Sequence, residues 1–166
     1  DHTEVFLDTS GESAAKHGYR KIPGLAPMIE ALATATIMAT KWDRKSPFVN
    51  PMCGSSTVAI EAVLLATNRR PGLFRTNYSF MHVLGYDDSF YSTEYRKLED
   101  QIIDVPGLKV IATDISENAI NISKVNAGDR IKESLGDLGP AFSSTTINAT
   151  TAFLTATLTA PSNNAY

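Results

Sequence analysis

The feature that most constrains this chain is a short apolar run, followed by a loop of small residues and then by an apolar helix. The run spans residues 47–49 and ends at Asn50-Pro51, because the residue before a proline is pushed out of the helical region. The loop spans residues 53–56, and apolar residues continue to Ala66. In open α/β sheets this unit binds nucleotide-like ligands beyond the carboxyl end of the strand. We therefore expect an α/β fold with a binding site at this loop.

Three kinds of ligand use a loop of this type, and the residues present favour one of them. A nucleoside triphosphate site needs Gly-Lys-Ser/Thr, and the loop has no lysine. A dinucleotide site needs Gly-x-Gly-x-x-Gly, and the loop contains only Gly54. The third ligand, S-adenosylmethionine (SAM), has no pyrophosphate to be cradled, so its site tolerates one glycine. SAM is therefore the predicted cofactor.

Three ordered motifs resemble one known family. Residues 51–57, Pro-Met-Cys-Gly-Ser-Ser-Thr, are similar to the Asp-Pro-Met-Cys-Gly-Ser-Gly-Thr motif of the THUMP-associated RNA methylases. Residues 7–11 and 16–20 resemble that family's Leu-Asp-Thr-Ser-Gly and Arg-Gly-Tyr-Arg, and residues 26–30 resemble its Ala-Pro-Leu-Lys-Glu. The family has aspartate where this chain has Asn50, and a second glycine where it has Ser56. Both differences are expected to weaken SAM binding without excluding it.

The resemblance implies the Rossmann-like fold of class I SAM-dependent methyltransferases. It also implies methyl transfer to guanine N2 of large-subunit ribosomal RNA by a cytoplasmic enzyme. In the family, an RNA-binding THUMP domain precedes the catalytic domain, and further strands complete it. Neither is recognised here, so we expect an excised catalytic portion, truncated at the C-terminus, that by itself methylates RNA poorly. Three alternatives stay open: an adenine-N6 nucleic-acid methyltransferase, a non-catalytic SAM- or RNA-binding module, and a nicotinamide dehydrogenase.

The pattern along the chain predicts a lead-in segment and one domain. Residues 1–22 are expected to form a hairpin-like lead-in, and residues 23–166 the SAM-binding domain, with a helical insertion at 69–107. Further helices are predicted at 28–41, 93–103 and 116–126. We expect the first to pack on the sheet and Gly128 to stop the last.

Three further strands are predicted after the insertion, at 108–113, 130–135 and 153–160. The strand that ends at Asn50 is expected to lie between those at 108–113 and 153–160, which places Gly54 and Asp114 around one crevice. Low-complexity disorder is the competing interpretation for residues 143–151, because no charged residue occurs from 138 to 166.

The predicted cofactor contacts follow the ends of these strands and the loop before the first helix. They are Pro27, Asn50, Pro51, Cys53, Gly54, Ser55, Thr57, Asp114, Ile115 and Asp137. Asp114 ends the second strand, where an acid accepts the ribose hydroxyls of an adenosine; its alternative role is to cap the next helix. By the resemblance, Asp137 holds the adenine amino group, although a turn aspartate fits equally well. We interpret Cys53 as a packing residue, because no partnered base is evident.

The catalytic residues are predicted at the end of the chain. Amino-methylating enzymes carry Asn/Asp-Pro-Pro-Tyr/Phe after their fourth strand, and residues 162–166 resemble an altered copy of this motif. Asn163 would accept hydrogen bonds from the target amine, and Tyr166 would stack on the flipped base. An accidental Asn and Tyr in a polar tail is the alternative.

Composition limits the classes of partner. The net charge of −3 argues against an independent grip on nucleic acid, so ribosomal RNA is expected to be held through the THUMP domain. The single cysteine fits a reducing compartment, and the three histidines are too scattered for a metal site. No run is apolar enough to cross a bilayer. The aromatic residues of the insertion either stack a base or pack the insertion onto the domain.

Overall fold

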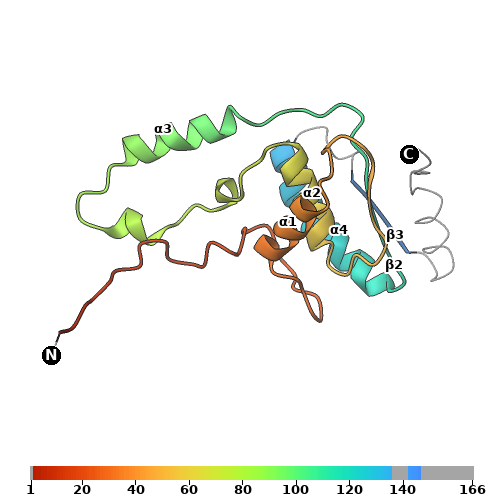
Figure 1. Ribbon diagram of the computed structural model, residues 1–166, viewed down its shortest axis with the longest axis horizontal. Coiled ribbons are helices and arrows are strands. Elements are labelled where there is room, and N and C mark those ends of the chain that lie inside the picture. Colours follow the sequence, from red (N-terminus) through yellow and green to blue (C-terminus); the bar gives the residue numbers. More distant parts are fainter. Residues whose placement is uncertain (1, 136–141, 147–166) are drawn as a thin grey trace, which may run out of the picture.

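Three parallel strands form a sheet in the computed structural model, which describes residues 2–135 and 142–146 (Figure 1). The strands are β1 (Phe48–Asn50), β2 (Val110–Asp114) and β3 (Phe142–Thr146), in the order β1-β2-β3. In β2, Val110 pairs with Phe48 on one side and with Phe142 on the other. The predicted pairing of the strand ending at Asn50 with the strand near 108–113 is confirmed. Its other expected neighbour, 153–160, lies outside the described residues.

Two helices follow β1 and β2 and pack against the sheet. α2 (Thr57–Ala66) contacts β1 and β2, and α4 (Glu117–Leu135) contacts β2 and β3. α2 is buried nearly all round, with Ile60 and Val63 fully inside. A helix that is apolar on every side is stable only when it is covered on every side. α2 meets this condition because it packs on the sheet and also against a second helix.

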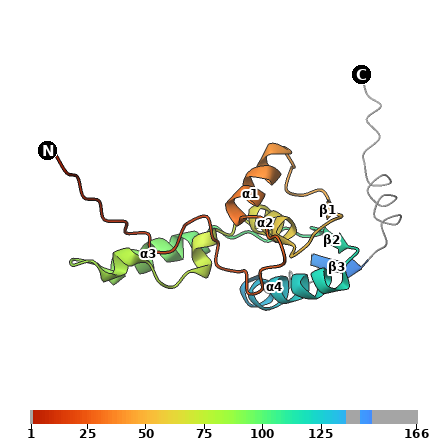
Figure 2. The ribbon, with the colours of Figure 1, turned by 90° about the horizontal axis from the view of Figure 1, so that it is seen from below.

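That second helix is α1 (Glu30–Ala39), and its place differs from the prediction. It packs mainly on α2 rather than on the sheet, with Ala33 and Ile37 buried (Figure 2). Leu32 and Met38 are more than half exposed. The apolar surface of this helix is wider than the face that α2 covers, so composition alone did not identify its neighbour.

An arm, residues 69–107, separates α2 from β2. It contains two 3-10 turns, η1 (Pro71–Phe74) and η2 (Ser79–His82), and the helix α3 (Asp88–Glu99). Figures 1 and 2 show α3 at the far end of the molecule from the sheet. The helix starts five residues before the predicted 93–103 segment, because the Asp87 carboxylate accepts a hydrogen bond from Ser89 N at 2.8 Å and caps it.

The predicted lead-in hairpin is wrong, since residues 2–22 contain no strand. The backbone of this segment bonds to other parts of the chain instead. Thr9 O accepts from Phe80 N in the arm at 2.8 Å, and Ser10 O accepts from the Arg75 guanidinium at 3.2 Å. Arm contacts therefore satisfy groups that a hairpin would have paired with each other.

The predicted strand at 130–135 is also wrong. α4 continues through Gly128 to Leu135, and the third strand of the described sheet is 142–146. A glycine inside a helix costs only about 1 kcal/mol relative to alanine, and the arginine, lysine, glutamate and leucine that follow favour helix. Gly128 is therefore not a sufficient stop signal. β3, which pairs with β2 on the side opposite β1, overlaps residues 143–151, for which disorder was the competing interpretation.

Candidate functional site

The loop after β1 is fastened to the end of β2 by two backbone donors. Cys53 N donates to Thr113 O at 2.9 Å, and Gly54 N donates to Asp114 Oδ2 at 2.9 Å. The loop therefore lies across the carboxyl ends of two neighbouring parallel strands. This is the crevice in which open α/β sheets bind their ligands, and the predicted meeting of Gly54 and Asp114 is confirmed.

Asp114 uses both of its carboxylate oxygens within the protein. Oδ2 accepts from Gly54, and Oδ1 accepts from Ser116 N at 2.9 Å. The capping role falls to Ser116, whose hydroxyl accepts from Ala119 N at 3.3 Å in the first turn of α4. A carboxylate offers about four acceptor positions. Asp114 therefore keeps acceptor capacity for a ligand while two backbone donors fix its orientation.

Gly54 and Ser56 both have left-handed backbone, with φ of 53° and 63°. A Cβ added to Gly54 would meet nothing within 4 Å, so this glycine serves its positive φ and leaves open space beside the loop. Ser56 is fully buried, and its Oγ lies 2.7 Å from Ser123 Oγ of α4. Its side chain therefore points into the protein, toward α4.

Ser123, on α4, holds the loop of residues 53–56, which we call the glycine loop, in place through its hydroxyl group. Its hydroxyl donates to Gly54 O at 2.9 Å, which leaves its oxygen free to accept from Ser56. The Cys53 thiol is buried and lies 3.7 Å from Ser123 Oγ. Cys53 thus packs between the loop and α4, as the sequence indicated, and no base lies beside it among the contacts described.

A strap, residues 17–27, forms the opposite wall of the crevice. The buried side chain of Asn126 in α4 accepts from Lys21 N and Ile22 N at 3.0 Å each, and donates to Ile22 O at 2.9 Å. Its amide also reaches Ser55 O at 3.5 Å. The Asn126 side chain therefore fixes the position of the strap relative to the glycine loop.

Arg20 links the strap to the first turn of α2. Its Nη2 donates to Met28 O and to Thr57 Oγ1, the latter at 2.9 Å, and lies 3.7 Å from Glu30 Oε2. Thr57 is thereby used inside the protein rather than presented to a ligand. The guanidinium joins the start of α1 to the start of α2, and so sets the distance between the two loops that flank the crevice.

His17, Thr34 and Glu61 form a buried polar cluster. His17 Nδ1 is 2.7 Å from Glu61 Oε1, and the hydroxyl of Thr34 donates to Glu61 Oε2 at 2.6 Å. The Tyr19 ring is fully buried beside them, and packs edge-on against Phe74 at 6.2 Å. Burial, followed by the negative charge of Glu61, raises the pKa of the Tyr19 phenol above its ordinary value.

These elements enclose a cavity of about 280 Å³, close to the lower end of the size range of small-molecule sites. Its lining combines the strap, the glycine loop, the end of β2 and the first turns of α4. The lining residues are Gly24, Leu25, Ala26, Pro27, Gly54, Ser55, Asp114, Ser116, Asn118, Ala119 and Ile122.

Four of the predicted cofactor residues line this cavity: Pro27, Gly54, Ser55 and Asp114. Asn50, Pro51, Cys53, Thr57 and Ile115 do not, and Ile115 is 69% exposed. Asp137, Asn163 and Tyr166 lie outside the described residues.

The sequence interpretation missed three residues that fix the site: Arg20, Ser123 and Asn126. Arg20 stands in one of the family-like motifs, which was the available signal. Ser123 and Asn126 are polar residues on the same helix face as the buried Ile120 and Ala127. Polar residues on a core-facing stripe indicate buried hydrogen bonds, but the pattern does not identify their partners.

The described part of the chain contains no group of three or more side chains suited to a metal ion. None of its helices is long and apolar enough to span a membrane.

Comparison with known proteins places the chain in a family. Residues 17–137 match the model described as the RMKL-like methyltransferase domain. The ribosomal RNA large subunit methyltransferase K/L of Pseudoalteromonas atlantica is 38% identical over 129 residues, which cover 76% of this chain and 18% of the relative. The protein of the same name from Buchnera aphidicola is 36% identical over 97 residues, covering 58% and 14%.

Solved structures show the same fold. SMU.472, assigned as a methyltransferase and solved with S-adenosylhomocysteine (SAH), has a TM-score of 0.73 at 28% identity. A predicted N6-adenine-specific DNA methylase from Listeria monocytogenes has a TM-score of 0.74 at 34% identity. Each alignment covers 85% of this chain and 35% of the solved chain, so the chain spans about a third of these proteins and less than a fifth of the curated relatives.

The predicted α/β, Rossmann-like methyltransferase fold is thus confirmed by structural neighbours, and the predicted relationship by the family match. The chain belongs to the family of RMKL-like methyltransferase domains.

Proposed function

We propose that this chain is the SAM-binding part of an RNA methyltransferase that acts on large-subunit ribosomal RNA. The observation that carries the proposal is the Gly54–Asp114 hydrogen bond at the mouth of the crevice. It places a fixed carboxylate beside a loop with open space, at the ends of two parallel strands. The solved relative that holds SAH supports SAM as the ligand.

The residues around the cavity fit such a ligand. Asp114 has acceptor capacity left for two ribose hydroxyls. Leu25, Ala26, Pro27 and Ile122 give the cavity apolar walls suited to an adenine ring and a methionine chain. Among the described residues, no lysine or arginine lines the cavity, which is consistent with a ligand that lacks phosphates.

Bound SAM would supply an already activated methyl group. The contribution of this chain is then positional: Asp114 orients the ribose, and the loop and the strap hold the ligand between them. Methyl transfer requires alignment of the attacking amine with the methyl group, so fixed walls account for much of the rate enhancement. By family resemblance, we propose that Asp137 would contact the adenine, and that Asn163 and Tyr166 would hold the target base.

The relatives named ribosomal RNA large subunit methyltransferase K/L support ribosomal RNA as the substrate, and we propose guanine N2 as the acceptor. The name of the Listeria monocytogenes structure supports adenine N6 as the second candidate. We further propose that RNA is recruited through a THUMP domain and that the enzyme is cytoplasmic. Transfer of a labelled methyl group to unmodified large-subunit RNA by this chain fused to a THUMP domain, followed by nucleoside analysis, distinguishes N2-methylguanosine from N6-methyladenosine.

Calorimetric titration of the 166-residue chain with SAM, SAH and NAD tests cofactor identity. We expect binding of SAM and SAH and no binding of NAD; NAD binding without SAM binding would contradict the proposal. Asp114→Ala should lose roughly 1.5–3 kcal/mol of SAM binding free energy, the scale of hydrogen bonds to a charged group. Asp104→Ala, which removes an exposed carboxylate in the arm, is the matched control and should leave the affinity unchanged.

A further inference from the structure

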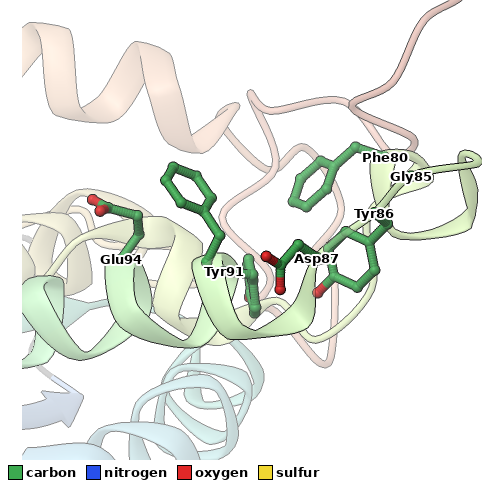
Figure 3. Close-up of a pocket in the computed structure, with 7 residues that line it drawn as sticks. Phe80, Gly85, Tyr86, Asp87, Tyr91 and Glu94 are labelled. Atoms are coloured by element: carbon green, nitrogen blue, oxygen red, sulfur yellow. The ribbon is translucent and has the colours of Figure 1, made fainter.

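A second cavity lies in the arm, far from the crevice. We name it the aromatic pocket; its volume is about 420 Å³ (Figure 3). It is lined by Phe80, Gly85, Tyr86, Asp87, Phe90, Tyr91 and Glu94. These residues come from η2, the turn before α3, and the first two turns of α3. The site proposed for SAM does not involve any of them.

Aromatic rings make up most of the pocket wall. The Phe80 ring lies 5.9 Å from the Tyr91 ring and 6.0 Å from the Tyr86 ring, measured between centroids. From outside the pocket, Tyr78 stacks on Phe80 at 5.0 Å and holds it in place. Phe90 remains 68% exposed. The rings are thus fixed by one another and are not buried in the core of the domain, as simple packing of the insertion would require.

The carboxylate of Asp87 lies beside these aromatic rings. Figure 3 shows the Asp87 carboxylate directed into the space between Phe80, Tyr86 and Tyr91, with Glu94 about two turns further along α3. Ser89 N and Ser89 Oγ both donate to Asp87 Oδ1, at 2.8 and 2.6 Å. These hydrogen bonds lower the pKa of Asp87, so it is ionised at neutral pH. The pocket therefore combines aromatic rings with a fixed negative charge.

We propose that the aromatic pocket binds the cationic end of a lysine or arginine side chain from a basic peptide. Aromatic faces and a nearby carboxylate both attract ammonium and guanidinium groups, and an apolar wall accepts the aliphatic stem. Charge around the pocket selects this partner over nucleic acid. Residues 86–100, which supply most of the lining, carry five acidic and two basic side chains, so this side of the pocket disfavours phosphate groups.

The test is an NMR titration of the full chain with a tetralysine peptide and with the same peptide acetylated on every Nε atom. Acetylation removes the charge of each lysine side chain and leaves its aliphatic stem unchanged. We expect the tetralysine peptide to shift the ring signals of Phe80, Tyr86 and Tyr91, and the acetylated peptide to bind at least about tenfold more weakly. Equal binding of the two peptides would overturn the proposal.

Two variants and one control separate the pocket from the general acidity of the arm. Asp87→Asn removes the charge but retains an N-cap residue, so α3 should remain folded. Phe80→Leu keeps an apolar side chain and removes the aromatic face. Each should weaken tetralysine binding by about fivefold or more. Asp100→Asn removes an exposed charge at the other end of α3 and should change it less than twofold.

Equal losses in Asp87→Asn and Asp100→Asn would show a diffuse electrostatic effect and refute a specific site. Ring shifts caused by an oligoadenylate and not by tetralysine would instead assign the pocket to a stacked base. SAM binding, at the other end of the molecule, should be the same in all three variants. Failure of this inference therefore leaves the proposed function untouched.

Discussion

Asn126 binds Ile22 through both ends of its side-chain amide, although the two residues are 104 positions apart. Oδ1 accepts from Ile22 N at 3.0 Å, and Nδ2 donates to Ile22 O at 2.9 Å. The side-chain amide of Asn126 thus makes the two hydrogen bonds to the Ile22 backbone that a neighbouring β-strand would otherwise make. A helix that follows β2 thereby positions a segment that precedes β1, and the wall of the crevice depends on it.

Replacing Asn126 with alanine should destabilise the protein and weaken SAM binding together. The substitution removes the three hydrogen bonds that the buried amide of Asn126 makes to the backbone of Lys21 and Ile22, which should lower the free energy of unfolding by about 2–3 kcal/mol. Urea denaturation measures this loss, and calorimetry measures the affinity. Asn121→Ala, an exposed position on the same helix, is the control and should have little effect on either. Equal behaviour of the two variants would contradict the role of Asn126.

Arg20→Lys should weaken SAM binding more than it weakens the fold. Lysine keeps the positive charge near Glu30 but lacks the planar guanidinium that reaches both Met28 O and Thr57 Oγ1. Without one of these two hydrogen bonds, the loops that flank the crevice are held together less firmly. We therefore expect a loss of about 1–2 kcal/mol of SAM binding free energy, the scale of one such hydrogen bond. Arg96→Lys, an exposed exchange in α3, should leave the affinity unchanged. A normal affinity in Arg20→Lys would show that Arg20 only stabilises the fold.

The sequence predicted the parts of the structure that depend on local patterns. The apolar run before Asn50, the small-residue loop and the acid that ends β2 are contiguous signals, and together they located the Gly54–Asp114 crevice. The strap could not be predicted in this way. Its hydrogen bonds join Arg20 to Thr57 and Lys21 to Asn126 across long stretches of chain, and no periodicity records such pairs.

Other errors arose where a local signal was weaker than its context. The sequence predicts that Gly128 ends the helix, but the cost of a glycine inside a helix, about 1 kcal/mol, is small compared with the packing of α4 on β2 and β3. The inward direction of the Ser56 side chain was not predicted either, because the backbone conformation that turns it toward Ser123 is not visible in the sequence. Both errors concern geometry that tertiary contacts determine.

Glu61→Ala should be among the most destabilising single substitutions in the chain. It removes the carboxylate that lies 2.7 Å from His17 Nδ1 and accepts from Thr34, at a site where the Glu61 and His17 side chains are 2% and 8% exposed. Each buried partner left without its hydrogen bond costs about 1–3 kcal/mol, and two are left here. Glu12→Ala breaks an exposed pair with Lys16 and should cost less than about 1 kcal/mol.

Urea denaturation compares these two substitutions, and Glu61→Gln provides a variant of nearly unchanged volume if the alanine variant does not fold. The glutamine variant should lose about 1–3 kcal/mol, because its NH₂ group cannot accept one of the two hydrogen bonds. Similar small losses at Glu61 and Glu12 would contradict the structural importance of the buried group.

Tyr19 should make the protein less stable above pH 10. Its pKa is raised in the folded state, first by burial and then by the charge of Glu61, whereas in the unfolded chain the phenol ionises near pH 10. Below that pH both states hold the proton and Tyr19 contributes no pH dependence. Above it the unfolded state loses a proton that the folded state keeps, so stability falls with rising pH, by about 1.4 kcal/mol per pH unit for this one group.

The Tyr19→Phe variant keeps the ring that packs against Phe74 and removes the ionisable hydroxyl. Urea denaturation of both proteins between pH 8 and 11 should therefore give a shallower alkaline decline for the variant. Parallel declines would show that the Tyr19 phenol ionises in the folded protein and that it is not held in a buried, negatively charged environment.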